Sequence, residues 1–445
     1  MITTENIQQI VNTYIEDPSQ VIQVLGPINT WDTSKVKNMK GLFKDKDTFN
    51  ENINDWNVSQ VTSMESMFEN ATSFNQPLDK WRTKKVCNMQ KMFLKATSFN
   101  QNINNWNVES VTNMANMFSG CSEFNSPLND WITESLTSTS YMFHDCPKFN
   151  QPIEKWNTSN VTNMSYMFSF ATSFNQSLNG WITKRVENFR GMFYGASKFN
   201  RSLYNWKTYN AKRMGFMFNS AFQFDQDISK WNTINVETME SMFHNAKTFN
   251  QDISNWDVTN VVNMKYMFYN AERFDQHIEK WDVESLRMWD NMFKGAHLML
   301  DYHNTFDTPP IDFFYQDTEE SSEDSESNTE EEATQPPPPP TAPNEPAQPP
   351  KETTQRPKET TQPTKEPTQP PTNEPAQPSP LKGGLRGGTP RLDALLATKN
   401  LKPRLFTNNI QISKPHEPPT PIRIVQQPKN HTLVYATKDH HLVKR

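Results

Sequence analysis

Cysteine is scarce in this chain, which has three cysteines among 445 residues. An odd and sparse set cannot form the disulfide framework of a small secreted domain. Cys121 and Cys146 occupy the same place in a repeated pattern, where other copies have alanine. We therefore expect both to be small core residues, as free cysteines usually are. Cys87 stands at a variable position and is expected to be exposed, which favours a reducing compartment.

Long apolar runs are also missing. No stretch approaches the ~20 apolar residues of a membrane span, and the start MITTENIQQIVNTYIEDP has neither the basic region nor the apolar core of a signal peptide. We therefore expect an intracellular or virion-associated protein rather than a secreted one. The sequence also lacks G-x-S-x-G, a phosphate-binding glycine-rich loop and H-E-x-x-H. We expect no enzyme, no catalytic or metal-binding residue and no cofactor.

What the chain has in abundance is a repeat. Eleven of its twelve tryptophans recur every 25 residues without an insertion, from Trp31 to Trp281. This period lies within the range of leucine-rich repeats. A single unit cannot bury its apolar face, whereas stacked units bury a continuous core. The rows of Trp, Met, Phe and Val are therefore interpreted as packed core, and the methionine rows as core rather than as a metal-binding device.

One copy, residues 249–274, shows the expected local structure. Trp256 and Val258 are two residues apart, so they would share one face of a short strand. The apolar residues of 264–271 follow the spacing i, i+3, i+4, i+7, which is typical of one face of a helix. Asn263 is a candidate N-cap for that helix. Asn250 and Asp275 suit turns because their side chains bond nearby backbone.

The unit resembles the BspA-type leucine-rich repeat of bacterial surface proteins, mycoplasma lipoproteins and large DNA viruses. The matching segments are WNVSQVTSMESMF (56–68), WNTSNVTNMSYMF (156–168) and FNQDISNW (249–256), and the likeness covers about residues 29–300. The resemblance implies protein–protein or adhesive binding, with no enzymatic activity and no cofactor. Exported members carry a signal or lipobox, and this sequence has neither.

The predicted fold class is an α/β solenoid, a leucine-rich-repeat-like right-handed stack of short parallel strands and short helices followed by a disordered tail. Residues 1–28 would form a helical N-terminal cap, 29–305 the eleven repeats, and 306–315 a degenerate C-terminal cap. Phe306 falls 25 residues after Trp281 and would mark a decayed twelfth strand. The apolar residues expected to close the core after it are Ile311, Phe313, Phe314 and Tyr315.

The tail is divided by composition. Residues 316–335 form an acidic linker, 336–380 a Pro/Thr-rich spacer, and 381–445 a basic arm, all expected to be mostly disordered. Residues 381–445 contain twelve Lys and Arg against three acidic residues. Their expected partners are an acidic protein surface, nucleic acid or an anionic membrane. A disordered basic end without a dedicated partner is the alternative.

Binding is expected where solvent-facing positions around the tryptophans depart from bland Asn, Asp or Ser. Stacked in order, these departures would make a basic stripe with aromatic groups across the concave face. Drift of unconstrained surface positions is the competing explanation, and mixed Lys and Tyr also allow nucleic-acid binding. The candidate partner-binding residues are Lys80, Arg82, Lys84, Lys85, Ile132, Ile182, Lys184, Arg185, Tyr204, Lys207, Tyr209 and Ile234.

Three functions remain open from the sequence. The first is a non-enzymatic protein–protein interaction scaffold with a tethered basic tail. The second is a structural or adhesive surface or virion component. The third is a nucleic-acid-associated protein that acts through residues 381–445. The identity of the partner and the oligomeric state do not follow from the sequence.

Overall fold

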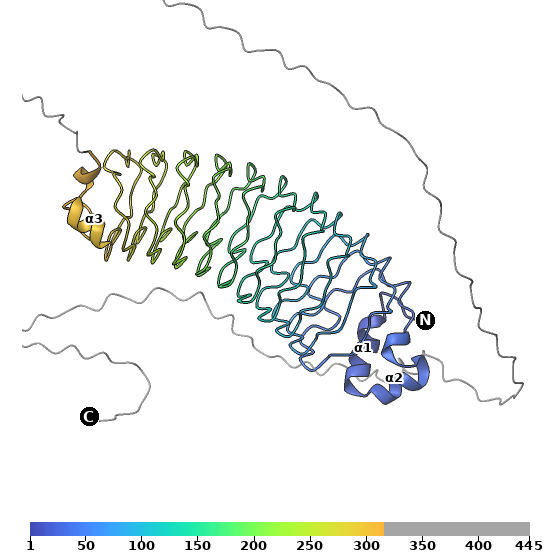
Figure 1. The fold of residues 1–445 in the computed structure, drawn as a ribbon. Coiled ribbons are helices and arrows are strands. Elements are labelled where there is room, and N and C mark those ends of the chain that lie inside the picture. Colours follow the sequence, from blue (N-terminus) through green and yellow to red (C-terminus); the bar gives the residue numbers. More distant parts are fainter. Residues whose placement is uncertain (316–445) are drawn as a thin grey trace, which may run out of the picture. The chain divides into compact units, whose positions relative to one another are not determined.

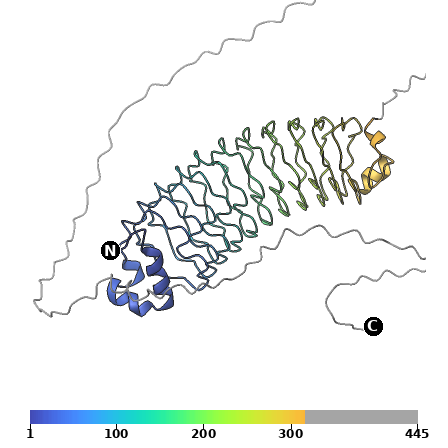
Figure 2. The same ribbon diagram turned by 180° about the vertical axis from the view of Figure 1, so that it is seen from behind.

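The structure of the chain is a computed structural model that describes residues 1–315. The acidic linker, the spacer and the basic arm predicted for 316–445 lie outside the described residues. The regular elements are α1 (Ile7–Glu16), α2 (Pro18–Leu25), the 3₁₀ turn η1 (Ile28–Thr30), α3 (His297–Tyr302) and the 3₁₀ turn η2 (Ile311–Tyr315). Between η1 and α3 each 25-residue repeat forms one coil, and the coils stack side by side (Figures 1 and 2).

We number the coils from one, which contains Trp31, to eleven, which contains Trp281, and count positions from the tryptophan of each coil. Neighbouring coils are joined by a parallel bridge between their +7 residues, from Asn38↔Ser63 to Asn263↔Met288. Backbone N–H groups at +8, +10, +12 and +14 donate to carbonyls at +7, +9, +11 and +13 of the next coil. Met64 N to Asn88 O is 3.0 Å, and Phe68 N to Met92 O is 2.8 Å. This ladder runs along the M-x-x-M-F segment.

The helix predicted for residues 264–271 is wrong, because this segment forms two successive four-residue turns. Met267 N donates to Met264 O at 3.1 Å, and Ala271 N donates to Phe268 O at 2.9 Å. Two such turns place apolar residues at i, i+3, i+4 and i+7, the same spacing that a helix produces. Asn263 is not a helix cap either, since its side chain accepts the N–H of Lys265 at 3.0 Å in a local turn.

The strand predicted around Trp256 and Val258 is also wrong. These residues lie in a segment with no strand assignment, and the bridge of this coil is at Asn263. The tryptophan segment turns the corner of the coil instead of pairing with its neighbours through the backbone.

Each coil contains two residues in the left-handed region, at +10 and +14. In the copy just described they are Tyr266 at φ 57° and Asn270 at φ 55°. Of these positions, five are glycine and seventeen carry a side chain. A left-handed residue with a Cβ costs roughly 1–2 kcal/mol, so the inter-coil hydrogen bonds and the core must outweigh this cost in every coil.

Three aromatic columns fill the core. Every indole from Trp56 to Trp281 donates its Nε1–H to the carbonyl 28 residues earlier, at 2.7 Å for Trp56 to Ile28 and 3.2 Å for Trp281 to Ile253. The phenylalanines at +12 and +18 stack within a coil and between coils, with centroids 4.1 Å apart for Phe68–Phe74. These buried N–H groups are therefore satisfied without any strand at the tryptophan.

Cys121 and Cys146 are fully buried in this core, as predicted, and Cys87 is exposed. Each buried thiol donates to a carbonyl 28 residues earlier, at 2.9 Å. Burial raises the pKa of both thiols, so they are inert core groups at neutral pH.

Asparagine forms a further column at +19. Asn75 Oδ1 accepts the backbone N–H of Asn100 at 2.9 Å and the side-chain amide of Gln101 at 3.0 Å. The same pattern recurs in the other F-N-Q copies, for example from Asn250 to Asp275 and Gln276. The expectation that these residues bond nearby backbone is therefore corrected, because they bond the next coil.

The ends of the stack are covered by different devices. At the N-terminus α1 buries Ile7, Ile10, Val11 and Tyr14, and the Tyr14 ring packs edge-on against Trp31 at 5.4 Å. Asp17 caps α2 through the Ser19 N–H, which is 3.1 Å from its Oδ1. Burial, together with the carboxylate of Glu51, raises the pKa of Tyr14 to about 12.

At the C-terminus, α3 and η2 cover the last coil. Phe313 and Phe314 are buried, as predicted, whereas Ile311 and Tyr315 are exposed. The predicted twelfth strand at Phe306 is wrong, since this side chain is 67% exposed. Instead, the next residue, Asp307, accepts the Phe293 N–H at 2.9 Å and ends the ladder.

Lys91→Gly should stabilise the protein. Lys91 is left-handed at φ 57°, and relief of a cost of about 1–2 kcal/mol exceeds the chain entropy of about 0.5–1 kcal/mol that glycine adds. The matched control is Lys35→Gly, at an exposed position without positive φ, which should destabilise. Urea unfolding followed by tryptophan fluorescence measures both, and lower midpoints for both variants would contradict the assigned turn geometry.

Removal of residues 81–105 should be tolerated better than removal of residues 81–92. The first deletion takes out one complete coil and keeps the +8 to +14 ladder in register, while the second shifts every later coil. We expect cooperative unfolding and buried-indole fluorescence to survive only the first deletion. Equal loss of both signals would show that the coils do not stack through a common register.

Candidate functional site: an aromatic surface on the inter-coil ladder

The predicted partner-binding residues lie along the tryptophan edge, which we define as positions −2 to +4 of each coil. All of them are exposed except Tyr204, which is half-buried. Ile132 is the most open of the three isoleucines, at 53%. Because this segment has no strand, these residues do not line a sheet face as the sequence analysis expected.

The charge of the tryptophan edge is partly neutralised by the preceding coil. Lys80 pairs with Asp55 at 2.7 Å, and Arg185 donates to Asn160 at 3.0 Å. The Tyr204 ring is covered by Lys230, whose Nζ lies 4.7 Å from the ring centroid. The basic stripe that the sequence predicts is therefore interrupted by carboxylates and amides.

A second exposed set lies on the face that carries the ladder, in coils five to ten. Its residues occupy positions +10, +13 and +14, and Phe170 and Tyr266 are 40% and 38% exposed while the others are half-buried. We call this set the aromatic surface. Its members are Tyr141, His144, Tyr166, Phe170, Tyr194, Phe216, His244, Tyr266 and Tyr269.

The left-handed turns explain why these rings lie outside the core. Tyr166 and Phe170 take φ of 54° and 57° at positions +10 and +14. In the next coil the same positions are Gly191 and Gly195. A Cβ on Gly191 would lie 2.3 Å from Tyr166 Cε1, and one on Gly195 would lie 2.6 Å from Phe170 Cδ1. The two rings therefore rest on the bare backbone of coil seven.

The rings contact one another from coil five to coil eight. Tyr141 stacks on Tyr166 with centroids 4.8 Å apart. Phe170 contacts His144 at 6.0 Å and Tyr194 at 4.7 Å, and Tyr194 reaches Phe216 at 6.3 Å. A second group follows in coils nine and ten, where His244 lies 4.7 Å from Tyr269.

Arg190 ties the middle of the aromatic surface together. Its Nε donates to the Tyr166 hydroxyl at 3.1 Å, and its guanidinium carbon lies 4.6 Å above the Phe216 ring. It also reaches Glu240 at 3.5 Å. Gly215 leaves room for this crossing, since a Cβ there would lie 3.2 Å from Arg190 Nη1. The guanidinium is thus held by four coils.

Burial sets the charge of the two histidines on this surface. It lowers the pKa of His144 and of His244, so both rings are neutral at neutral pH. His144 Nδ1 is buried without a hydrogen-bond partner among the described residues. Burial also raises the pKa of Tyr141. The aromatic surface is therefore neutral apart from the Arg190–Glu240 pair.

Sequence reasoning missed this surface because it assigned positions +10 to +14 to a helix. The available signal was compositional: Tyr, Phe and His gather at +10 and +13 in coils five to ten, while other coils carry Gly, Ser, Lys or Asn at +10. Only the turn geometry shows that these positions face outward together.

A separate group of potential metal ligands lies at the other end of the described chain, where the sequence analysis expected none. His277, Glu279 and His303 bring one ligand atom each to within 4.8 Å of one another. Burial raises the pKa of Glu279, but its own backbone N–H and His303 outweigh burial and hold it below its usual value.

The fold and its surface define a tandem-repeat protein. A family model described as "Mycoplasma protein of unknown function, DUF285" matches residues 16–131, 112–224 and 205–306. These three overlapping matches cover more than half of the chain, which therefore belongs to this family of mycoplasma-type repeat proteins. Comparison with curated proteins and with solved structures gives no significant match. Within residues 1–315, no helix is long and apolar enough to cross a bilayer.

Acidification should destabilise the protein through His244. Burial holds its folded-state pKa below the ordinary value of 6.5, so the unfolded state binds the proton more readily. The contribution to stability is complete above the unfolded pKa and is lost as the pH falls through the folded pKa. We expect His244→Phe to lose less stability than the wild type between about pH 7.5 and about pH 5. Urea midpoints at both pH values measure this, and equal losses would contradict it.

Proposed function

We propose that the repeats form a leucine-rich-repeat-like solenoid of the BspA type. Three observations support this: a 25-residue period without insertion, one coil per repeat, and a parallel bridge at the same position of every neighbouring pair. The coils differ from most leucine-rich repeats in using consecutive turns where a helix is common. Stacking of this kind produces extended surfaces suited to binding.

We further propose that the protein is a non-enzymatic interaction module that binds a protein partner through the aromatic surface. The observation that carries this proposal is the run of contacting, part-exposed rings around Arg190. The core explains the aromatic columns at 0, +12 and +18, but it places no requirement on the rings at +10, +13 and +14. Their clustering in coils five to ten therefore needs a different cause.

The chemistry of this surface suits a protein partner. Tyr and Arg dominate binding hot spots because they offer large contact area and a polar end at low entropic cost. Tyr166 and Arg190 are already held by a mutual hydrogen bond, so little freedom remains to be lost on binding. Exposed apolar groups next to a single charged pair match the apolar centre and polar rim of an interface.

The tryptophan edge supports binding less well. Its isoleucines are isolated from one another along the coils, and its lysines are separated by Asp79, Asp130 and Asp257. Scattered exposed apolar residues are normal on a protein surface. The residues that the sequence analysis selected thus remain the comparison surface for the test.

Phe170→Ala should weaken peptide binding about tenfold, the loss of a hot-spot side chain. Peptides selected from a displayed random library against the full-length chain serve as probes, and fluorescence polarisation measures their affinity. Ile182→Ala, an equally exposed residue of the tryptophan edge, is the matched control and should leave affinity unchanged.

Urea midpoints equal to wild type must accompany both variants, so that folding does not account for the difference. Selected peptides that lose affinity in Ile182→Ala and not in Phe170→Ala would place binding on the tryptophan edge and contradict the proposal. Peptides that are indifferent to both substitutions would contradict it as well.

A further inference from the structure

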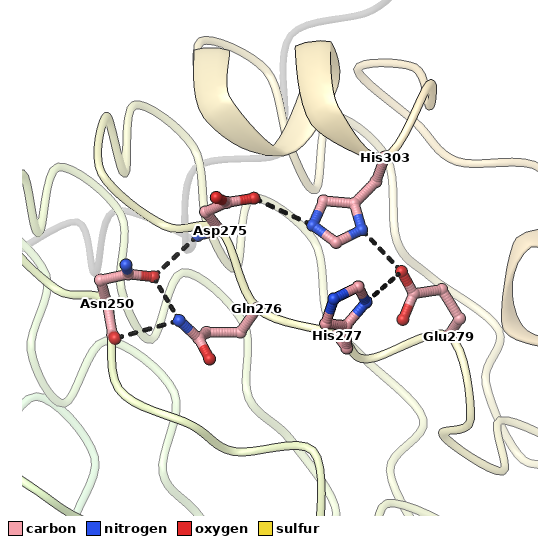
Figure 3. A network of polar contacts seen from close by, with 6 residues as sticks. All are labelled: Asn250, Asp275, Gln276, His277, Glu279 and His303. Carbon is pink, nitrogen blue, oxygen red and sulfur yellow. Dashed lines mark hydrogen bonds and ion pairs between the residues drawn. The ribbon is translucent and has the colours of Figure 1, made fainter.

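The group of His277, Glu279 and His303 lies where the last coil meets the C-terminal cap. His277 and Glu279 precede Trp281 by four and two residues, and His303 directly follows α3. Figure 3 shows the His303 ring between Asp275 and Glu279, with His277 beside the same Glu279 oxygen. Residues far apart in the chain are thus brought to one point.

The distances are those of a compact ligand set. Glu279 Oε1 lies 2.6 Å from His303 Nδ1 and 3.3 Å from His277 Nδ1. The two imidazoles meet edge to face at 4.9 Å. The His303 side chain is 7% exposed and that of His277 is 86% exposed, so the group has one buried and one solvent-facing side.

These residues depart from the repeat. In coils nine and ten, Asp227 and Asp252 stand at −4 and accept the N–H of Ser229 and Ser254 in a local turn. In coil eleven this pair is replaced by His277 and Glu279, both capable of binding a metal. The stacking of coils does not require this change, because the neighbouring coils fold without it.

We propose that His277, Glu279 and His303 bind a zinc ion that fastens the C-terminal cap to the last coil. Two imidazoles and one carboxylate are a ligand set that zinc prefers. Asp275 accepts from the far side of the His303 ring, with Oδ1 3.0 Å from Nε2. That contact fixes the tautomer in which Nδ1 carries the lone pair, which is the usual role of a carboxylate behind a histidine ligand.

Zinc would enter with a small adjustment. Ligand atoms about 2.0–2.1 Å from a tetrahedral zinc are separated by about 3.3 Å, the separation that His277 Nδ1 and Glu279 Oε1 already have. The shorter 2.6 Å contact to His303 Nδ1 must open. His277, being almost fully exposed, is free to rotate, and the solvent side leaves a fourth position for water.

The test is zinc titration of the EDTA-treated full-length chain by isothermal calorimetry. Because histidines of the tail also attract zinc, all proteins carry His440→Ala and His441→Ala. We expect one strong site, at least about tenfold weaker in His277→Ala and unchanged in His297→Ala, a control histidine in α3 outside the group. Magnesium should not compete, since it prefers ligand sets made of oxygen.

Thermal unfolding supplies a second readout. Zinc should raise the midpoint of the parent protein but not that of His277→Ala, whose exposed side chain is not needed for folding. If His303→Gln fails to fold, Glu279→Gln replaces it as the buried-ligand variant and should also lose the strong site. Absence of a strong site in the parent protein, or unchanged affinity in His277→Ala, would overturn the proposal.

Discussion

The described part of the chain depends on the backbone hydrogen bonds that each coil donates to the next. Alternate N–H groups from +8 to +14 face the neighbouring coil, as Met64 and Phe68 show, and the N–H groups between them close four-residue turns. Both sets of bonds can form only if the residues at +10 and +14 enter the left-handed region, even where they carry a side chain. The conformational cost is therefore a direct consequence of the ladder.

The same constraint decides which side chains lie inside. With left-handed residues at +10 and +14, the Met, Met, Phe and Ala side chains of each coil point to the core, where the Phe and Trp columns stack. The indole N–H of each tryptophan then reaches back to the preceding coil, so the corner of the coil is satisfied without a second strand ladder. Because each coil contacts only its neighbours, the first and last coils must be covered, by α1 and Tyr14 at one end and by α3 and Phe313 at the other.

Positions that the ladder directs outward are free to vary, and function is expected there. In coils five to ten they hold contacting rings around Arg190, whereas in coil eleven the positions before Trp281 hold His277 and Glu279. The aromatic surface and the histidine–carboxylate group belong to different edges and different ends of the stack. The first would recognise a partner, and the second would fasten the cap, so the two proposals stand independently.

The sequence by itself determined the period, the number of coils, the buried columns and the core role of Cys121 and Cys146, because each repeats an apolar residue type at a fixed interval. It did not distinguish a helix from two successive turns, since both place apolar residues at i, i+3, i+4 and i+7. Only the tertiary structure decided that choice, through hydrogen bonds between coils 25 residues apart. For the same reason the aromatic surface, and the meeting of His303 with Glu279, followed from the fold: they join side chains whose proximity no local pattern encodes.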